Sequence, residues 1–142
     1  MATVLILDND VNHRLQMQGA LNKRNHDAIC VHAGATDEMA RLAEEKLRQI
    51  ASPDAPVDVL VLDMRLDDAE LGGAIVYEKL IAAGCRALWK HVVVVSIWCE
   101  GGTQAEALRQ FMQDNAIPME NCLPKRTART ERLVNRILEL VE

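Results

Sequence analysis

The sequence has little of what marks nucleic-acid, zinc-thiolate or membrane proteins. It contains one Phe and one Tyr and has a net charge of -5, whereas surfaces that bind nucleic acid are basic and often carry stacking rings. Its cysteines form no CxxC pair and no cysteine–histidine cluster. Its apolar runs are far shorter than the roughly 20 residues that span a bilayer. We therefore expect no nucleic-acid partner and no membrane partner.

The sequence also begins without the basic region of a secretion signal, because an apolar strand-like run follows at once. A cytoplasmic location is therefore expected. The cysteines are interpreted as reduced thiols; they are Cys30, Cys85, Cys99 and Cys122. For Cys99, a redox sensor is the alternative, but no basic residue lies close in sequence to activate its thiol.

The chain of 142 residues is expected to form a single domain, residues 1–142, without repeats, low-complexity segments or linkers. The expected strands are 3–7, 28–32, 57–62, 91–96 and a short one near 121–123. The expected helices are 11–24, 36–50, 72–83, one from 101–103 to about 115, and a last one that includes 133–141. Five β–α units in a row predict an α/β fold with a doubly wound, five-stranded parallel sheet and helices on both faces.

Polar side chains follow the apolar runs where the strands are expected to end. They are Asp8, Asn9 and Asp10 after the first run, Asp63 after the third, Ser96 after the fourth and Lys125 after the fifth. In open parallel sheets, ligands bind beyond the carboxyl ends of the strands. Acids, a hydroxyl and an amine are therefore expected to converge on one edge of the sheet.

This constellation lies in "LDND", "LVLDMRLDD", "VVVVSIWCE" and "CLPKRT", and it resembles the receiver domain of two-component response regulators over essentially the whole chain. The resemblance implies that Asp63 accepts a phosphoryl group from a histidine kinase or a phosphotransfer protein. It assigns Ser96 and Lys125 to the phosphoryl oxygens. The Mg²⁺ ligands that it implies are Asp8, Asn9, Asp63 and the backbone carbonyl of Arg65. No output domain follows, so a stand-alone receiver is expected.

Several residues depart from the receiver pattern. Asn9 replaces an acid and adds no charge; Asp10 is the nearby compensating ligand, although its interpretation as the N-cap of the first helix is favoured. Ile97 would narrow access to Asp63. Cys122 stands where many receivers carry an aromatic switch residue. These departures favour an alternative function, a pseudo-receiver that acts as an interaction module without phosphorylation.

A second alternative is a haloacid-dehalogenase-type phosphatase, because "VLILDNDV" matches the first motif of that family. Asp8 would then be the nucleophile and Asp10 the general acid, with Ser96 and Lys125 as the next two motifs. That family needs further metal-binding acids on a strand after the lysine, where this sequence predicts a helix. It also leaves Asp63 without a role. We therefore expect a phosphoacceptor signalling domain and not a turnover enzyme.

The last helix carries three arginines on one face, Arg129, Arg132 and Arg136. Such a stripe is typical of a solvated helix face. In receivers this helix often forms the dimer or target interface, so a homodimer through it is the alternative expectation. The resemblance also implies a downstream protein target that is reached through protein–protein contacts.

Overall fold

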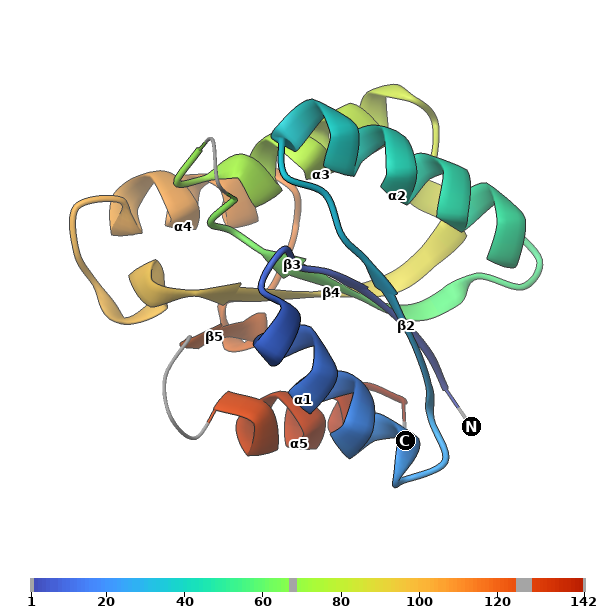
Figure 1. Cartoon of the computed structure of the whole chain (residues 1–142). Helices are drawn as coiled ribbons and strands as arrows, with labels where there is room; N and C mark the ends of the chain where they lie inside the picture. Colours follow the sequence, from blue (N-terminus) through green and yellow to red (C-terminus); the bar gives the residue numbers. More distant parts are fainter. Residues whose placement is uncertain (1, 67–68, 125–128, 142) are drawn as a thin grey trace.

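The computed structural model describes residues 2–66, 69–124 and 129–141. These residues form one sheet of parallel strands in the order β2-β1-β3-β4-β5 (Figure 1). The strands are β1 (Thr3–Leu7), β2 (Asp27–Val31), β3 (Val57–Asp63), β4 (Trp89–Ser96) and β5 (Cys122–Pro124). The predicted five-stranded, doubly wound parallel sheet is therefore confirmed. The order reverses between β1 and β3, which makes their carboxyl ends the expected ligand position.

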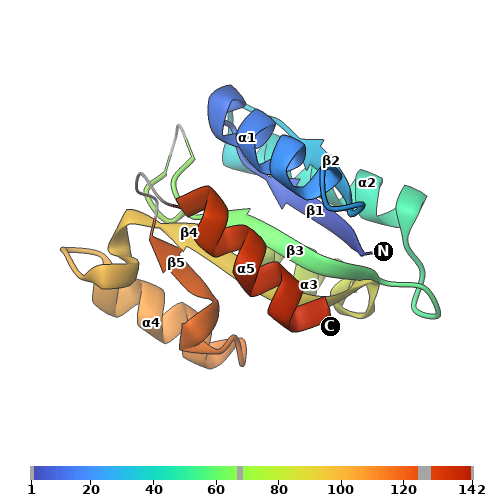
Figure 2. The ribbon, with the colours of Figure 1, turned by 90° about the horizontal axis from the view of Figure 1, so that it is seen from below.

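Helices cover both faces of this sheet. They are α1 (Val11–Asn22), α2 (Thr36–Ile50), α3 (Gly72–Ala82), α4 (Ala105–Asp114) and α5 (Arg129–Val141). Helices α2, α3 and α4 lie on one face and α1 and α5 on the other (Figures 1 and 2). None of the described helices has the length and apolar character needed to cross a membrane.

Short 3₁₀ turns complete the described chain, namely η1 (Arg86–Leu88), η2 (Ile97–Glu100) and η3 (Met119–Asn121). The sequence pattern does not predict them, because such short turns present no repeated apolar spacing. One of them, η2, directly follows β4.

The central strands are buried on both faces, which explains their continuous apolar runs. In β1, Leu5 and Leu7 join the core under α2 and α3, whereas Val4 and Ile6 join the core under α1 and α5. The same alternation of side chains holds in β3 and β4. The two cores fix the register of the sheet and thereby the positions at which its strands end.

The arginine face of α5 differs from the sequence-based expectation. Arg136 is partly buried, its Nε donates to Oδ1 of Asn121 at 2.7 Å, and its other nitrogens pair with Glu120 and Glu139. Asn121 donates in turn to the carbonyl oxygen of Val92. Arg136 therefore fastens α5 to η3 and β4. Arg132 is exposed, as a solvated face requires.

Candidate functional site

Two buried carboxyl groups lie together at the carboxyl ends of β1 and β3. Asp8 is 1% exposed and Asp63 is 2% exposed, and the two side chains are close enough for Asp63 to affect the pKa of Asp8. The convergence predicted for these two acids is present.

Asp8 has further partners, one of which the sequence analysis missed. His13 of α1 is fully buried, and its Nδ1 is hydrogen-bonded to Oδ2 of Asp8. The backbone N–H of Asp10 donates to Oδ1 of Asp8 at 2.8 Å. Burial raises the pKa of Asp8, but its hydrogen bonds with His13 and the Asp10 N–H, together with its interaction with Asp63, outweigh burial and hold the pKa below its ordinary value. Asp8 is therefore ionised at neutral pH.

His13 reaches this position because of the way α1 begins. The side chain of Asp10 accepts the backbone N–H of His13 at 3.1 Å and is the N-cap of the helix. The N-cap interpretation of Asp10 is thus confirmed, and one of its oxygens is committed to the helix. Within the described part of the chain, Nε2 of His13 has no hydrogen-bond partner. The sequence pattern gives no signal for this contact, because the acid that His13 meets lies outside the helix.

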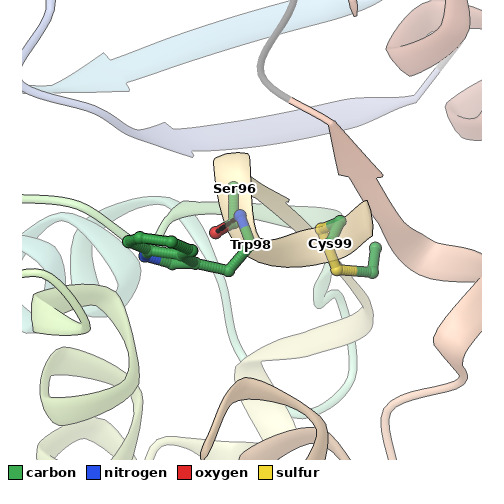
Figure 3. The surroundings of a disulfide bond; sticks show 4 residues. Ser96, Trp98 and Cys99 are labelled. Atoms are coloured by element: carbon green, nitrogen blue, oxygen red, sulfur yellow. Dashed lines mark hydrogen bonds between the residues drawn. A yellow bond between two sulfur atoms is a disulfide. The ribbon is translucent and has the colours of Figure 1, made fainter. Parts of the chain in front are cut away.

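Ser96 ends β4 beside the acidic pair. In the sheet register Val95 is the partner of Asp63, so Ser96 lies one residue beyond it, and it is 3% exposed. Its Oγ accepts the backbone N–H of Trp98 at 3.0 Å and caps η2 (Figure 3). A hydroxyl that accepts a bond keeps its own hydrogen for another acceptor. Ser96 can therefore still donate to a group placed beside Asp63.

The other predicted site residues are Asn9, Arg65 and Lys125. Asn9 is partly buried directly after Asp8, and Arg65 is exposed two residues beyond Asp63. Lys125 lies outside the described residues, as do Asp67 and Asp68. Pro124, the residue before the lysine, pairs in the sheet with Ser96. The strand that leads to Lys125 is thus positioned beside the site.

In the loop after Asp63, Leu66 and Ala69 exchange both backbone hydrogen bonds. It then meets α3 at Gly73, whose N–H donates to the carbonyl oxygen of Met64 at 3.0 Å. A Cβ atom at Gly73 would lie 2.4 Å from the carbonyl oxygen of Asp63. Only glycine allows α3 to begin this close to the acid.

Replacing Gly73 with Ala should lower the free energy of unfolding by about 1–3 kcal/mol, because the new methyl group meets backbone atoms that can only move together with Asp63. Urea denaturation followed by tryptophan fluorescence measures the change. Gly19 of α1 is the matched control, since a Cβ there meets nothing within 4 Å. Gly19→Ala should stabilise the protein by about 0.5–1 kcal/mol. A Gly73 variant as stable as wild type would contradict the close contact.

The donor atoms at this edge fit Mg²⁺. No cluster of three or more His, Cys, Asp or Glu side chains suitable for a metal occurs among the described residues. Carboxylate oxygens of Asp8 and Asp63, the amide oxygen of Asn9 and a backbone carbonyl are nevertheless the hard oxygen ligands that Mg²⁺ takes. Asp8 uses both oxygens for hydrogen bonds, but an ionised carboxylate has about four lone-pair directions, which leaves room for a cation.

The cysteines correct one expectation. Cys99 of η2 and Cys122 of β5 form a disulfide, so their interpretation as reduced thiols is wrong. Cys30 and Cys85 are free cysteines, as expected. The pairing was missed because the two residues are 23 positions apart, and only the turn η2 brings Cys99 back against β5.

Comparison with known proteins shows the fold. No protein-family model and no curated protein matches the sequence. The structure is similar to a response regulator receiver protein from Pseudomonas putida, with a TM-score of 0.65, 21% identity, and coverage of 99% of this chain and 94% of that one. It is also similar to a response regulator from Thermotoga maritima, with a TM-score of 0.66, 15% identity, and coverage of 99% of this chain and 98% of that one. For the chemotaxis protein CheY4 of Vibrio cholerae the TM-score is 0.69 and the identity 16%, with coverage of 99% of this chain and 98% of that one. The chain therefore has the fold of response regulator receiver domains.

Proposed function

We propose that this chain is a receiver whose Asp63 accepts a phosphoryl group from a histidine kinase or a phosphotransfer protein. The observation that carries the proposal is the pair of buried carboxyl groups, Asp8 and Asp63, at the carboxyl ends of the paired central strands β1 and β3. Ser96 stands on the next strand of the sheet, one residue beyond the partner of Asp63. The receiver fold supports the same assignment.

In the transfer, an oxygen of ionised Asp63 attacks the phosphorus atom of the donor. The new P–O bond forms as the P–N bond of the phosphohistidine breaks, and the imidazole leaves. His13 and the Asp10 N–H keep Asp8 ionised and oriented throughout the transfer.

Four groups would hold Mg²⁺ here, namely Asp8, Asn9, Asp63 and the carbonyl oxygen of Arg65. When bound, the ion supplies the positive charge that phosphoryl transfer between anions requires. Ser96 donates its hydroxyl hydrogen to a phosphoryl oxygen. Lys125 would add a compact positive charge at another. Asp10 remains a weaker candidate ligand, since its side chain caps α1.

The test is phosphorylation of the purified chain by acetyl phosphate with Mg²⁺, read by intact mass. We expect one added phosphoryl group in the wild type and none in Asp63→Asn or without Mg²⁺. Asp58→Asn is the matched control, because Asp58 is an acid at the opposite end of the same strand, where it accepts the N–H of Thr3. It should be phosphorylated like the wild type. An adduct that survives Asp63→Asn would contradict the assignment of the acceptor.

A pseudo-receiver is the second candidate function, and one observation favours it. Both oxygens of Asp8 are already occupied, by His13 and by the Asp10 N–H, and the hydroxyl of Ser96 accepts the Trp98 N–H. Asp8 and Ser96 thus already hold partners within the protein when no ligand is bound. Failure of the folded wild type to gain a phosphoryl group or to respond to beryllofluoride, even at high Mg²⁺, would overturn the phosphoacceptor proposal and support this function.

The partners follow from the proposal. Phosphoryl transfer places the chain with a histidine kinase or phosphotransfer protein in the cytoplasm, and a downstream protein target would read its state. The exposed part of α5 around Arg132 offers a surface for that target or for a homodimer. A phosphatase of the haloacid-dehalogenase type would instead turn over a generic phosphate monoester, and the same preparation tests that activity directly.

A further inference from the structure

The disulfide joins two segments that flank the proposed phosphoryl site. Cys99 belongs to η2, the turn that directly follows Ser96, and Cys122 is the first residue of β5 (Figure 3). Both cysteines are partly exposed, so a small thiol can reach them. In the cytoplasm, the location proposed above, disulfides are rare and usually serve catalysis or redox sensing.

The tether acts on the surroundings of Ser96 from two sides. The hydroxyl of Ser96 holds the N–H of Trp98, and Cys99 is the next residue of the same turn. Pro124, two residues after Cys122, is the sheet partner of Ser96 and directly precedes Lys125. The disulfide therefore locks the turn that Ser96 caps onto the strand that leads to the proposed lysine.

The turn η2 is also restrained on the side away from the disulfide, by the packing of Trp98. The ring of Trp98 points away from η2 in the direction opposite to Cys99 (Figure 3). It packs so closely against Gly102 that a Cβ atom added to Gly102 would lie 2.5 Å from Cε3 of Trp98. Gly102 has a φ of 105°, which only glycine adopts without strain. With the indole ring packed against Gly102 on one side, the disulfide restrains the turn on the other.

The two free cysteines do not compete for this chemistry. Cys85 is fully buried, and Cys30 lies on β2, at the opposite edge of the sheet from β5. Burial raises the pKa of both thiols, which lowers the fraction of reactive thiolate. Thiol–disulfide exchange in the folded protein is thereby confined to Cys99 and Cys122.

We propose that Cys99 and Cys122 form a reversible thiol–disulfide site that controls phosphorylation of Asp63, with the disulfide form the poorer acceptor. This inference rests on the proposed function. A phosphoryl group on Asp63 must be accommodated beside Ser96. The turn tied to β5 adjusts to that group less readily than a turn whose Cys99 is free.

The exchange needs two equivalents of a low-molecular-weight thiol. The first thiolate attacks one sulfur of the disulfide, the S–S bond breaks, and the other cysteine leaves as a thiolate and takes up a proton. A second thiol then attacks the mixed disulfide, which releases the second cysteine and forms the small disulfide. The protein gains two electrons and two protons, and the small thiol is oxidised.

The experiment compares oxidised and reduced full-length chain, whose redox state is verified by thiol alkylation and mass. We expect reduction to increase beryllofluoride affinity and the rate of phosphorylation by acetyl phosphate by about five-fold or more, the lower range of known couplings between sites. Coupling in binding is reciprocal, so beryllofluoride should favour reduction of the disulfide in glutathione buffers by the same factor as reduction favours beryllofluoride binding.

Two variants control the comparison. Cys99→Ser/Cys122→Ser should behave as the reduced protein under both conditions, and Cys30→Ser should keep the full redox response. If the double variant does not fold, chemically reduced wild type supplies the same comparison without substitution. Equal affinities and rates in the two redox forms would overturn the proposal, as would a disulfide that survives excess thiol in the folded chain.

A separate measurement distinguishes failure of this inference from failure of the proposed function. If neither redox form takes up beryllofluoride or phosphate, the proposed function fails. Hydrogen exchange then tests the tether by itself, because the N–H groups of Trp98 and Gly101 are bonded within the η2 segment. Reduction should speed their exchange, and unchanged exchange would show that the disulfide does not restrain the turn.

Discussion

Replacing His13 with Leu should lower the free energy of unfolding by about 3 kcal/mol, because it removes the partner of a buried, ionised carboxylate. His13 is fully buried, and Asp8 is 1% exposed. Leucine fills the buried position of His13 on α1 with an apolar side chain, but Oδ2 of Asp8 then loses its hydrogen bond to the imidazole ring. Urea denaturation followed by the fluorescence of the buried Trp89 measures the loss.

The pH dependence of the free energy of unfolding shows whether the loss in His13→Leu comes from the ionised carboxylate of Asp8. The folded-state pKa of Asp8 lies below its ordinary value of 3.8, so its contribution to stability is present above that value and is lost as the pH falls through the folded pKa. Without His13, burial dominates and this contribution diminishes. The two proteins should therefore differ most near neutral pH and approach each other in acid.

Two variants serve as controls for His13. His32→Leu changes an exposed histidine and should alter stability by no more than about 0.5 kcal/mol. In a double-mutant cycle, Asp8→Asn should remove much of the cost of His13→Leu, because the unpaired charge is gone. A His13 variant as stable as the His32 variant would show that the contact contributes nothing.

Reduction of the disulfide should lower the free energy of unfolding by about 3 kcal/mol. Cys99 and Cys122 are separated by 23 positions, and the chain-entropy model gives this magnitude for closing a loop of that length in the unfolded state. Denaturation curves with and without reductant measure the difference. Cys99→Ala/Cys122→Ala should show the lower stability in both conditions.

The matched control for this second prediction is Cys30→Ala, which changes a free cysteine on β2. It should respond to reductant as strongly as the wild type. A reductant effect that persists in the Cys99→Ala/Cys122→Ala variant would assign the loss of stability to something other than this bond. No effect in the wild type would mean that the unfolded chain is not restrained by it.

Much of the fold could be predicted because each strand is recognisable from its own run of apolar residues. The apolar run before Asp8 and the run before Asp63 are long enough to be strands buried on both faces, and parallel strands bring their ends to one edge. The capping role of Asp10 was equally accessible, since an acid before a helical pattern is a local signal. These features depend on residues that are close together in the sequence, and the spacing of apolar and polar residues is enough to recognise them.

The contacts of His13 and of Cys99 could not be predicted in the same way. A histidine in a helix gives the same sequence pattern whether it faces solvent or a buried carboxylate. The neighbour that decides between the two, Asp8, lies outside the helix. Cys122 pairs in the sheet with Val94, and only the unpredicted turn η2 folds Cys99 back toward it. Both depend on how elements pack, which a pattern within one element does not contain.

The last strand has a consequence for how the sheet meets other chains. β5 is an edge strand of 3 residues that ends in Pro124, and proline has no N–H to offer a neighbouring strand. The opposite edge is β2, with 5 residues and only Asp27 as a charged residue. Intermolecular strand pairing in concentrated or partly unfolded samples should therefore start at β2. A lysine placed on the exposed edge of β2 is the change that would best improve colloidal solubility.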